Sequence, residues 1–389
     1  MTVPLLDVRR QNAPLAGELM AAFERVLRSG EYILGAEMEA FERAAAAVAG
    51  ARHGIAVSSG TDAILLALMA LDIGAGDEVI CPAFTFFATA GCIARAGARP
   101  VFVDSCPWCF NIDPAGIERS ITPRTRAVIP VHLFGQMAHM DEVMDIARRH
   151  NLSVIEDAAQ ALGTVYRQRP AGSLGAFGAF SFYPSKNLGG FGDAGLLVTS
   201  DDALAARARL LRCHGGERRY FHRLVGGNFR MDALQAALLA VKLPHLEEYS
   251  RRRAGHAAAY TASLASLPGA AGRAVSIILP APHPGHGHIW NQYTLRVVRG
   301  PLWSLPESPR DTLKRALDAQ GIGSEIYYPC PMHQQECFRG FGPHAPLPVC
   351  EQLAMECLSI PVFPELTAGE RECVVTAMAG FLHSPLGAR

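Results

Sequence analysis

The sequence lacks an excess of charge of either sign, a long apolar run and the apolar core of a signal peptide. Lysine plus arginine and aspartate plus glutamate each number 36, so the formal net charge is zero. Binding to nucleic acid or to an anionic membrane usually needs a basic excess, so we expect neither partner. The best apolar run, residues 63–71, ends at Asp72 and is too short to cross a bilayer. We therefore expect a cytoplasmic protein.

The chain also lacks internal repeats, low-complexity segments and the cysteine pattern of a small secreted domain. Its 10 cysteines are scattered over 389 residues and are expected to be reduced thiols. Cys106-Pro-Trp-Cys109 is similar to a redox or zinc pair, but no second closely spaced pair accompanies it. We expect a surface loop there and no metal. A chain of this length favours one large domain and a smaller one.

Short apolar strands alternate with helices through the first half of the chain. After helical periodicity at residues 15–27 and 36–48, strands are predicted at 54–58, 78–81, 99–104, 127–131, 153–157, 179–182 and 195–199. Helices are expected from residues 61, 85, 140 and 201. This alternation predicts an α/β fold with a mostly parallel seven-stranded sheet covered on both faces. Ligands of such sheets lie beyond the carboxyl ends of the strands.

The second half of the chain predicts a smaller α/β domain. A helix from about residue 231 keeps its apolar period to 246 and extends to about 267, a length suited to joining two domains. Residues 269–288, rich in Gly, Pro and Ala, are expected to form a boundary loop. Strands near 292–298 and 324–328 and helices near 311–320 and 367–381 complete the prediction. We place the large domain at residues 1–250 and the small one at 251–389.

The segment 177–195 contains the most informative residue, Lys186. It follows an aromatic, strand-like run and precedes a glycine-rich segment, where the backbone can turn sharply. An amine between apolar walls has a lowered pKa and can form a Schiff base with a carbonyl, such as the aldehyde of pyridoxal phosphate (PLP). A loop lysine with its amine in water is the plain alternative.

Other polar residues follow predicted strands, and each has a plain alternative. Ser58-Ser59-Gly60-Thr61-Asp62 opens a helix and suits a phosphate, although such residues also serve as ordinary caps. Asp157 ends a strand and could pair with a pyridine nitrogen, or cap the next helix. Gln160 could reach a ring oxygen of the cofactor. Phe86 could stack on a planar ring or lie in the core.

Further candidates lie in three segments. Ser181 and Asn228 offer phosphate donors, and Arg230, Tyr327, Tyr328 and His333 are candidates for contacts with substrate. Strand packing would explain the two tyrosines equally well, and a surface turn would explain the histidine.

Together these motifs resemble the PLP-dependent sugar aminotransferases of the DegT/DnrJ/EryC1/StrS family. The matching segments, in chain order, are Ser-Gly-Glu-Tyr-Ile-Leu-Gly, Ser-Gly-Thr-Asp-Ala, Gly-Asp-Glu-Val-Ile-Cys-Pro-Ala-Phe-Thr-Phe, Val-Ile-Glu-Asp-Ala-Ala-Gln, Ser-Phe-Tyr-Pro-Ser-Lys-Asn-Leu-Gly, His-Gly-Gly-Glu-Arg-Arg-Tyr, Gly-Gly-Asn-Phe-Arg-Met-Asp-Ala-Leu-Gln-Ala-Ala and Tyr-Tyr-Pro-Cys-Pro-Met-His. They span nearly the whole chain.

The resemblance implies PLP-dependent transferase fold type I, which is aspartate-aminotransferase-like, and a homodimer with active sites at the subunit interface. It implies that Lys186 is the Schiff-base lysine and that Asp157 contacts the pyridine nitrogen. The other implied cofactor contacts are Phe86 on the ring face, Gln160 near the ring hydroxyl, and Gly60, Thr61, Ser181 and the partner subunit's Asn228 at the phosphate. Because Lys186 is present, the dehydratase branch of the family, which has histidine there, is not expected.

The implied activity is amino transfer from L-glutamate to a ketone of a nucleotide-linked deoxysugar, in the biosynthesis of a surface polysaccharide or a glycosylated metabolite. By the same analogy, Arg230, Tyr327, Tyr328 and His333 are candidates for binding the sugar or the donor carboxylate. An aminotransferase acting on a ketocyclitol is an alternative that the residues do not separate. A PLP-binding regulator without turnover is the alternative from another class of protein.

Overall fold

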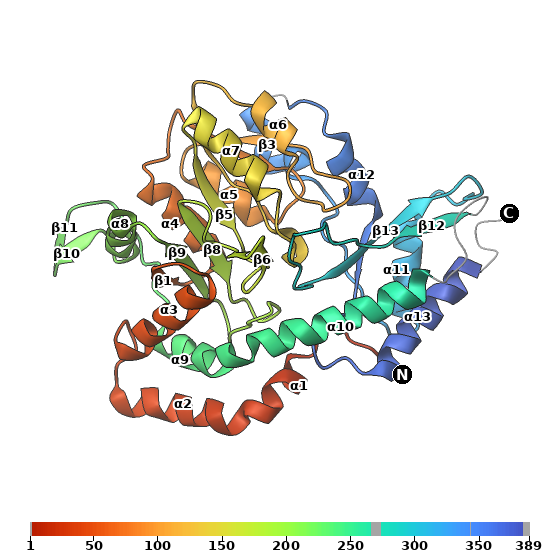
Figure 1. Ribbon diagram of the computed structural model, residues 1–389, viewed down its shortest axis with the longest axis horizontal. Helices are drawn as coiled ribbons and strands as arrows, with labels where there is room; N and C mark the ends of the chain where they lie inside the picture. The colour runs from red at the N-terminus through yellow and green to blue at the C-terminus, as the bar shows by residue number, and fades with distance from the viewer. Residues whose placement is uncertain (1, 266–273, 343, 384–389) are drawn as a thin grey trace.

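Two β-sheets organise the described part of the chain (Figure 1). The first core consists of the apolar side chains on both faces of the larger sheet, and the second core lies beside the smaller sheet. The computed structural model describes residues 2–265, 274–342 and 344–383. The larger sheet has seven strands in the order β1-β9-β8-β5-β4-β2-β3. Its strands are β1 (His53–Val57), β2 (Glu78–Pro82), β3 (Arg99–Val103), β4 (Thr125–Val128), β5 (Ser153–Asp157), β8 (Phe177–Ser181) and β9 (Gly195–Thr199).

Only β9 runs against its neighbours in this sheet, because β1 and β8 both pair with it in antiparallel fashion. The pairs β8–β5, β5–β4, β4–β2 and β2–β3 are parallel. The carboxyl ends of the other six strands therefore share one edge. The predicted α/β fold with a mostly parallel seven-stranded sheet is confirmed.

Helices cover both faces of this sheet, because successive strand residues point to opposite sides. Ile55 and Val79 pack toward one face, whereas the next residues in sequence, Ala56 and Ile80, pack toward the other. One face is covered by α4 (Gly60–Ala70), α5 (Phe87–Arg95) and α8 (Asp202–Arg212). The other is covered by α3 (Ala36–Val48), α6 (Pro114–Arg119), α7 (Met140–His150) and α9 (Ala233–Lys242).

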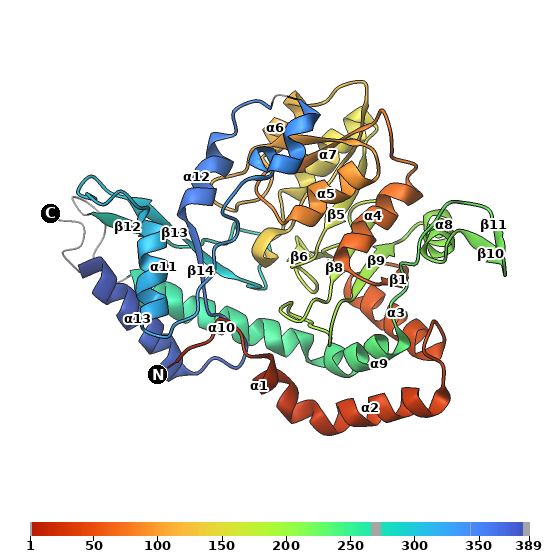
Figure 2. The same cartoon turned by 180° about the vertical axis from the view of Figure 1, so that it is seen from behind.

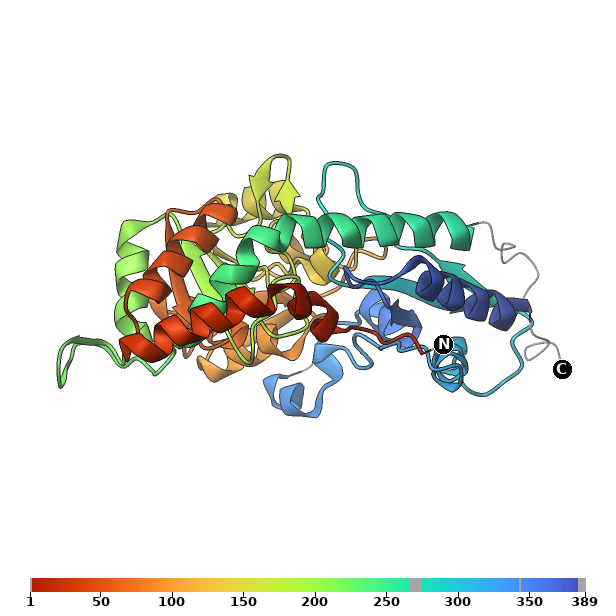
Figure 3. The ribbon, with the colours of Figure 1, turned by 90° about the horizontal axis from the view of Figure 1, so that it is seen from below.

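The second core surrounds a three-stranded antiparallel sheet of β12 (Val275–Ile278), β13 (Tyr293–Arg299) and β14 (Cys357–Ile360). Helices α10 (Leu246–Ala265), α11 (Pro309–Ala319) and α13 (Ala368–His383) pack against it. Seen from below, the green helix α10 runs from the region of the larger sheet to that of the smaller one (Figure 3). Helix α10 therefore connects the two sheets, while the division of the chain into two domains stays a prediction.

Several elements lie outside these two layers. Helices α1 (Val8–Asn12) and α2 (Ala16–Ser29) lead into the large sheet, and α2 packs on α9. Two short hairpins are β6 (Val165–Tyr166) with β7 (Arg169–Pro170), and β10 (Gly216–Arg218) with β11 (Phe221–His222). The second of these projects from the body of the protein (Figures 1 and 2).

Three predicted elements differ from the structure. The single helix expected from residue 231 is interrupted by a 3₁₀ turn, Leu243–His245, because Pro244 cannot donate a helical hydrogen bond. The expected loop at 269–288 contains β12, while its residues 269–273 lie outside the described residues. The expected strand at 324–328 is wrong, since only Glu325 pairs there, with Ser359.

The proposed division at residue 250 remains a prediction, and contacts cross it in both directions. The amide of Val3 donates to the Gly321 carbonyl at 2.9 Å, so the start of the chain joins the second core. Helix α12 (Pro348–Glu356) packs partly on the first core. The Asp104 carboxylate accepts the N–H groups of Val349 and Cys350 at the start of α12, at 3.0 and 2.7 Å.

Candidate active site

A cavity of about 610 Å³ lies at the shared carboxyl edge of the large sheet. The second half of the chain closes it with Gln292, Tyr327 and Tyr328. Nine of the predicted site residues line this cavity: Gly60, Thr61, Phe86, Asp157, Gln160, Ser181, Lys186, Tyr327 and Tyr328. The fold thus brings together residues from many separate segments.

Lys186 lies in a compact loop that follows β8. Its amide donates to the Tyr183 carbonyl at 2.8 Å, and the Gly190 amide donates to the Phe182 carbonyl at 2.7 Å. A side chain at Gly189 would meet the Pro184 carbonyl oxygen at 2.3 Å, so the loop needs glycine there. Burial lowers the pKa of Lys186 to about 8, although the negative charge of Asp157 opposes the shift. A substantial fraction of the amine is therefore neutral near pH 8.

A second buried lysine supports this loop from outside the cavity. Lys242, on α9, donates from Nζ to the Gly189 carbonyl at 2.6 Å. Burial also lowers the pKa of Lys242 to about 8. The whole sequence contains only one further lysine, Lys314, which pairs with Asp318 at 3.1 Å on the exposed side of α11. Of the three lysines, Lys186 alone lines the cavity.

Asp157, the last residue of β5, presents a buried carboxylate to the same cavity. The Thr89 hydroxyl donates to its Oδ2 at 2.7 Å, and the Ala159 amide donates to its Oδ1 at 3.2 Å. Burial raises the pKa of Asp157, while the Thr89 hydrogen bond lowers it. A cation against this carboxylate would favour its ionised form. These contacts suit a partner for a protonated ring nitrogen.

The start of α4 forms another part of the wall. Ser59 caps the helix by accepting the Asp62 amide at 3.0 Å, which leaves the N–H groups of Gly60 and Thr61 without intrahelical partners. A Cβ atom at Gly60 would lie 2.8 Å from the Cβ of Ser181. The glycine therefore allows the helix start to approach the end of β8, where backbone donors and the helix dipole suit a phosphate.

Aromatic and amide groups form the remaining predicted part of the site. Phe86 is exposed beside the cavity, and its ring centroid lies 6.3 Å from that of Tyr328. The Phe134 amide donates to Gln160 Oε1 at 2.5 Å, and Gln160 also hydrogen-bonds with the Tyr328 hydroxyl. Burial raises the pKa of Tyr328, so its hydroxyl stays protonated.

Three predicted site residues do not line the cavity of this chain. His333 Nε2 lies 3.2 Å from the Glu351 carboxylate of α12. Arg230 pairs through its backbone with Val57 at the end of β1. Asn228 is exposed and pairs through its backbone with Cys213, close to the β10–β11 hairpin. Within one chain, these residues do not share the cavity with Lys186 and Asp157.

Sequence reasoning missed several residues that line the cavity. These are Thr85, Tyr183, Ser185, Asp193 and Gln292, among other lining residues. All but Gln292 lie in segments that the motifs had already drawn attention to. Gln292 lies outside those segments. It is the residue directly before β13, and it reaches the cavity from the second core.

The geometry fits one class of protein. The cavity offers an amine for a carbonyl, a carboxylate for a ring nitrogen, and N–H groups for a phosphate, and this combination suits PLP. The sheet is that of the PLP-dependent fold type I enzymes, as predicted.

Comparison with known proteins agrees with this class. The chain matches the DegT/DnrJ/EryC1/StrS aminotransferase family over residues 15–379. It is 46% identical over 382 residues to a "pleiotropic regulatory protein" of Geobacillus stearothermophilus, covering 98% of this chain and 99% of the relative. It is 42% identical over 381 residues to a UDP-N-acetyl-3-dehydro-alpha-D-glucosamine 3-aminotransferase of Acidithiobacillus ferrooxidans, covering 98% of each.

A solved structure gives the same result. The crystal structure of DesV from S. venezuelae, in complex with a ketimine intermediate, superposes with a TM-score of 0.91. It is 42% identical in sequence, and the match covers 98% of this chain and 99% of that one. The chain belongs to the DegT/DnrJ/EryC1/StrS aminotransferase family and is a PLP-dependent aminotransferase. The predicted family, enzyme class and cofactor are confirmed.

No helix within residues 2–265, 274–342 and 344–383 combines the length and apolar character needed to cross a membrane.

Proposed function

We propose that this enzyme transfers the amino group of L-glutamate to a ketone of a nucleotide-linked sugar, in the cytoplasm. The observation that carries the proposal is one cavity containing Lys186, Asp157 and the start of α4. Its volume, about 610 Å³, is within the range of cavities that hold a cofactor together with part of a substrate. The UDP-linked sugar substrate in the name of the 42% identical aminotransferase supports the acceptor class.

The cofactor would be held by residues of this chain from four directions. Gly60, Thr61 and Ser181 would bind its phosphate, and Asp157 its ring nitrogen. Phe86 would cover one face of the ring, and Gln160 would contact the ring oxygen. When bound, PLP supplies an electron sink for the carbanion formed during amino transfer.

Lys186 would act both as the point of attachment and as the base. Its pKa of about 8 leaves a neutral amine available to accept a proton from the donor's α-carbon. The same amine would then deliver that proton during transfer. The hydrogen bond from Thr89 would hold the negatively charged Asp157 carboxylate in position. The hydrogen bond from Lys242 to the Gly189 carbonyl would keep the Lys186 loop in place.

The active unit would be a homodimer. Large apolar side chains are exposed on the projecting β10–β11 hairpin and on α2, and Asn228 lies at the base of that hairpin. We propose that the partner subunit's Asn228 completes the phosphate site. Tyr327 and Tyr328 line the cavity and would contact substrate, while Arg230 and His333 could do so only after rearrangement or across the dimer.

Covalent labelling tests the assignment of Lys186. Borohydride treatment of PLP-saturated enzyme, followed by peptide mapping, should label Lys186 and leave Lys242 and Lys314 unlabelled. Lys186→Ala should lose turnover by at least about 10⁴-fold while retaining its fold. The matched Lys242→Met variant removes a buried lysine of similar pKa and should still be labelled at position 186. Label on Lys242 alone would overturn the assignment.

A substrate screen tests the acceptor. The enzyme in its amine-loaded form should be turned over by ketosugars linked to UDP, dTDP or GDP, and not by ketocyclitols. Turnover with a ketocyclitol alone would select the alternative acceptor. Mixing the PLP form with L-glutamate should change its absorbance to that of the amine form. An unchanged spectrum would instead support a regulator without turnover.

A further inference from the structure

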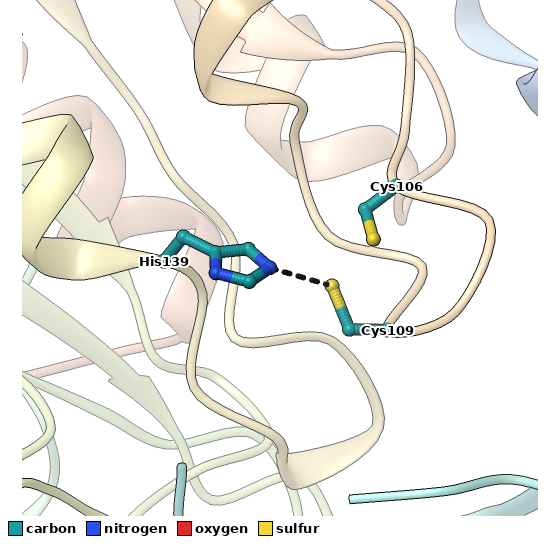
Figure 4. Close-up of side chains that lie close together, drawn as sticks. All are labelled: Cys106, Cys109 and His139. Carbon is teal, nitrogen blue, oxygen red and sulfur yellow. Dashed lines mark hydrogen bonds between the residues drawn. The ribbon is translucent and has the colours of Figure 1, made fainter. Parts of the chain in front are cut away.

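A cluster of two cysteines and a histidine lies apart from the active-site cavity. Cys106 and Cys109 belong to the loop that follows β3, and His139 is the residue directly before α7. Their side chains point toward one another (Figure 4). One ligand atom from each residue lies within 4.8 Å of the others, and Cys109 Sγ is 3.7 Å from His139 Nε2.

The local backbone holds the two cysteines in a tight turn. The Cys106 amide donates to the Asn111 carbonyl at 2.7 Å, and the Phe110 amide donates to the Cys106 carbonyl at 3.0 Å. Ser105 and Ile112 pair across the base of the loop. These hydrogen bonds hold the backbone of both cysteines in a defined conformation, as metal-binding Cys-x-x-Cys turns require.

The separation of these atoms matches a tetrahedral metal ion. With Zn–S of about 2.3 Å and Zn–N of about 2.0 Å, tetrahedral angles place sulfur about 3.6 Å from nitrogen and about 3.8 Å from a second sulfur. The observed 3.7 Å agrees with the first of these values.

Two more imidazole rings lie beside His139. The ring centroids of His283 and His286 are 5.0 and 4.7 Å from that of His139. His286 Nδ1 lies 3.1 Å from the Met137 carbonyl oxygen, so Nδ1 donates there and Nε2 keeps its lone pair. A backbone carbonyl that fixes one ring nitrogen is the usual arrangement behind a metal-binding histidine.

We propose that Cys106, Cys109 and His139 bind a zinc ion, and that His283 or His286 becomes the fourth ligand after a side-chain movement, because neither ring places a nitrogen within 4.8 Å of all three ligand atoms. Two thiolates and two neutral imidazoles form a closed tetrahedral set, which is typical of a structural site. The sequence predicted no metal, because no second cysteine pair is present. The remaining ligands lie at least 30 residues further along the chain, and folding brings them to the two cysteines.

The ion would stabilise the segment beside the active site. Asn111, in the same loop, accepts the Leu133 amide at 2.9 Å and donates to the Gln136 carbonyl at 3.0 Å. Leu133 lines the cavity, and Arg296 of β13 donates to the Pro107 carbonyl at 3.3 Å. The zinc would thus connect the loop after β3 with the start of α7 and with the segment 283–286, which precedes β13.

Metal analysis of the purified full-length holoenzyme tests the site directly. After loading with Zn²⁺ and removal of loosely bound metal, we expect about one zinc per chain. Cys106→Ser and His139→Gln should lose that zinc, whereas Cys337→Ser, at an exposed cysteine, should retain it. Co²⁺ in place of zinc should give visible absorption bands of a tetrahedral thiolate site, at longer wavelengths than PLP absorbs.

Three results would overturn the proposal. They are no bound zinc in the wild type after loading, zinc content unchanged in Cys106→Ser and His139→Gln, or a Cys106–Cys109 disulfide found by mass spectrometry in protein purified without oxidant. His139→Gln changes a partly exposed side chain, so its fold is expected to survive, and circular dichroism checks this. Zinc content unchanged in both His283→Ala and His286→Ala would overturn the assignment of the fourth ligand. Because zinc content does not depend on Lys186, these results are independent of the proposed reaction.

Discussion

Glu156 and Asp157 are neighbours in sequence but serve different purposes, since adjacent strand residues point to opposite faces of the sheet. Asp157 faces the cavity, whereas Glu156 is fully buried on the other side. Its carboxylate accepts the amides of Gly172, Leu174 and Gly175 at 3.0, 2.7 and 2.8 Å. It also lies 2.9 Å from His132 Nε2. One buried carboxylate thus fixes an entire turn.

Removing this carboxylate should strongly destabilise the protein. In Glu156→Ala, one buried N–H group, two partly buried N–H groups and the buried His132 lose their acceptor, so we expect a loss of about 3–5 kcal/mol in the free energy of unfolding. The matched control, Glu118→Ala, removes an exposed carboxylate paired with Arg149 and should cost far less, because water screens an ion pair at the surface. Urea unfolding monitored by circular dichroism measures both. Equal losses in the two variants would contradict the argument.

The pKa of Lys186 predicts how attachment of the cofactor depends on pH. Only the neutral amine attacks an aldehyde, and burial lowers the pKa of this lysine to about 8. The rate at which apoenzyme binds PLP covalently should therefore rise with pH and level off above about 8, rather than near the ordinary lysine value of about 10.4. Rapid-mixing absorbance measurements between about pH 6 and 9.5 follow this rate.

The Asp157→Asn variant tests the direction in which Asp157 shifts the pKa of Lys186. The aspartate charge raises the pKa of Lys186, so its removal should shift the midpoint to lower pH. A midpoint that moves to higher pH, or stays unchanged, would show that the two side chains do not interact as the structure indicates.

At the scale of elements, the close approach of α4 to β8 depends on a single glycine. Gly60→Ala would place a methyl group 2.8 Å from the Ser181 Cβ and displace the helix start. We expect PLP affinity to fall by at least about tenfold, or about 1.4 kcal/mol. The reason is that the displaced helix start carries the N–H groups of Gly60 and Thr61 away from the phosphate. Gly255→Ala in α10 is the matched control, since nothing lies within 4 Å of its added methyl group.

The control variant should behave in the opposite direction. Alanine has a higher helix propensity than glycine, so Gly255→Ala should stabilise the protein by up to about 1 kcal/mol and leave PLP affinity unchanged. Equilibrium titration with PLP and thermal unfolding separate the two effects. Unchanged affinity in Gly60→Ala would show that the α4 start does not hold the phosphate.

Elements buried on both faces were the easiest to predict from sequence. Strands β5 and β9 begin and end at the predicted residues, because each is a short run of apolar residues between turns. The predicted strand at 324–328 failed for the opposite reason: its tyrosines suit a strand, but only Glu325 finds a backbone partner. Pairing depends on what lies alongside, which a local pattern does not contain.

Prediction of the site residues from sequence has the same limit, because it too depends on which segments pack together. Lys186, Asp157 and Gly60 could be predicted because each follows a recognisable strand, and parallel strands end at one edge. Gln292 could not, since it reaches the cavity only through the packing of the second core. His139 could not be linked with Cys109 either, because their proximity results from the folding of two distant loops. His333 was placed by motif alone, and its contact with Glu351 depends on where α12 packs.

At the scale of the whole molecule, two surfaces remain exposed that a monomer would not be expected to leave uncovered. On α2, Met20, Phe23 and Leu27 follow helical spacing and form one apolar stripe. On the projecting hairpin, Tyr220 and Phe221 are 80% and 71% exposed. Apolar side chains gathered in this way indicate an interface. The hairpin also lies close in sequence to Asn228, which the proposed dimer needs at the partner's phosphate.

Phe221→Asp should therefore weaken both the dimer and the cofactor site. The wild type should elute with twice the chain mass of 41.7 kDa in light-scattering chromatography, and Phe221→Asp with the mass of one chain. Its PLP affinity should fall by about tenfold or more, because the partner's phosphate donor is lost, and should recover partly as protein concentration rises. Leu302→Asp, at an exposed leucine between β13 and α11, should change neither property. A wild type that is monomeric yet binds PLP tightly would mean that one chain completes the site alone, and Asn228 would then have no role in it.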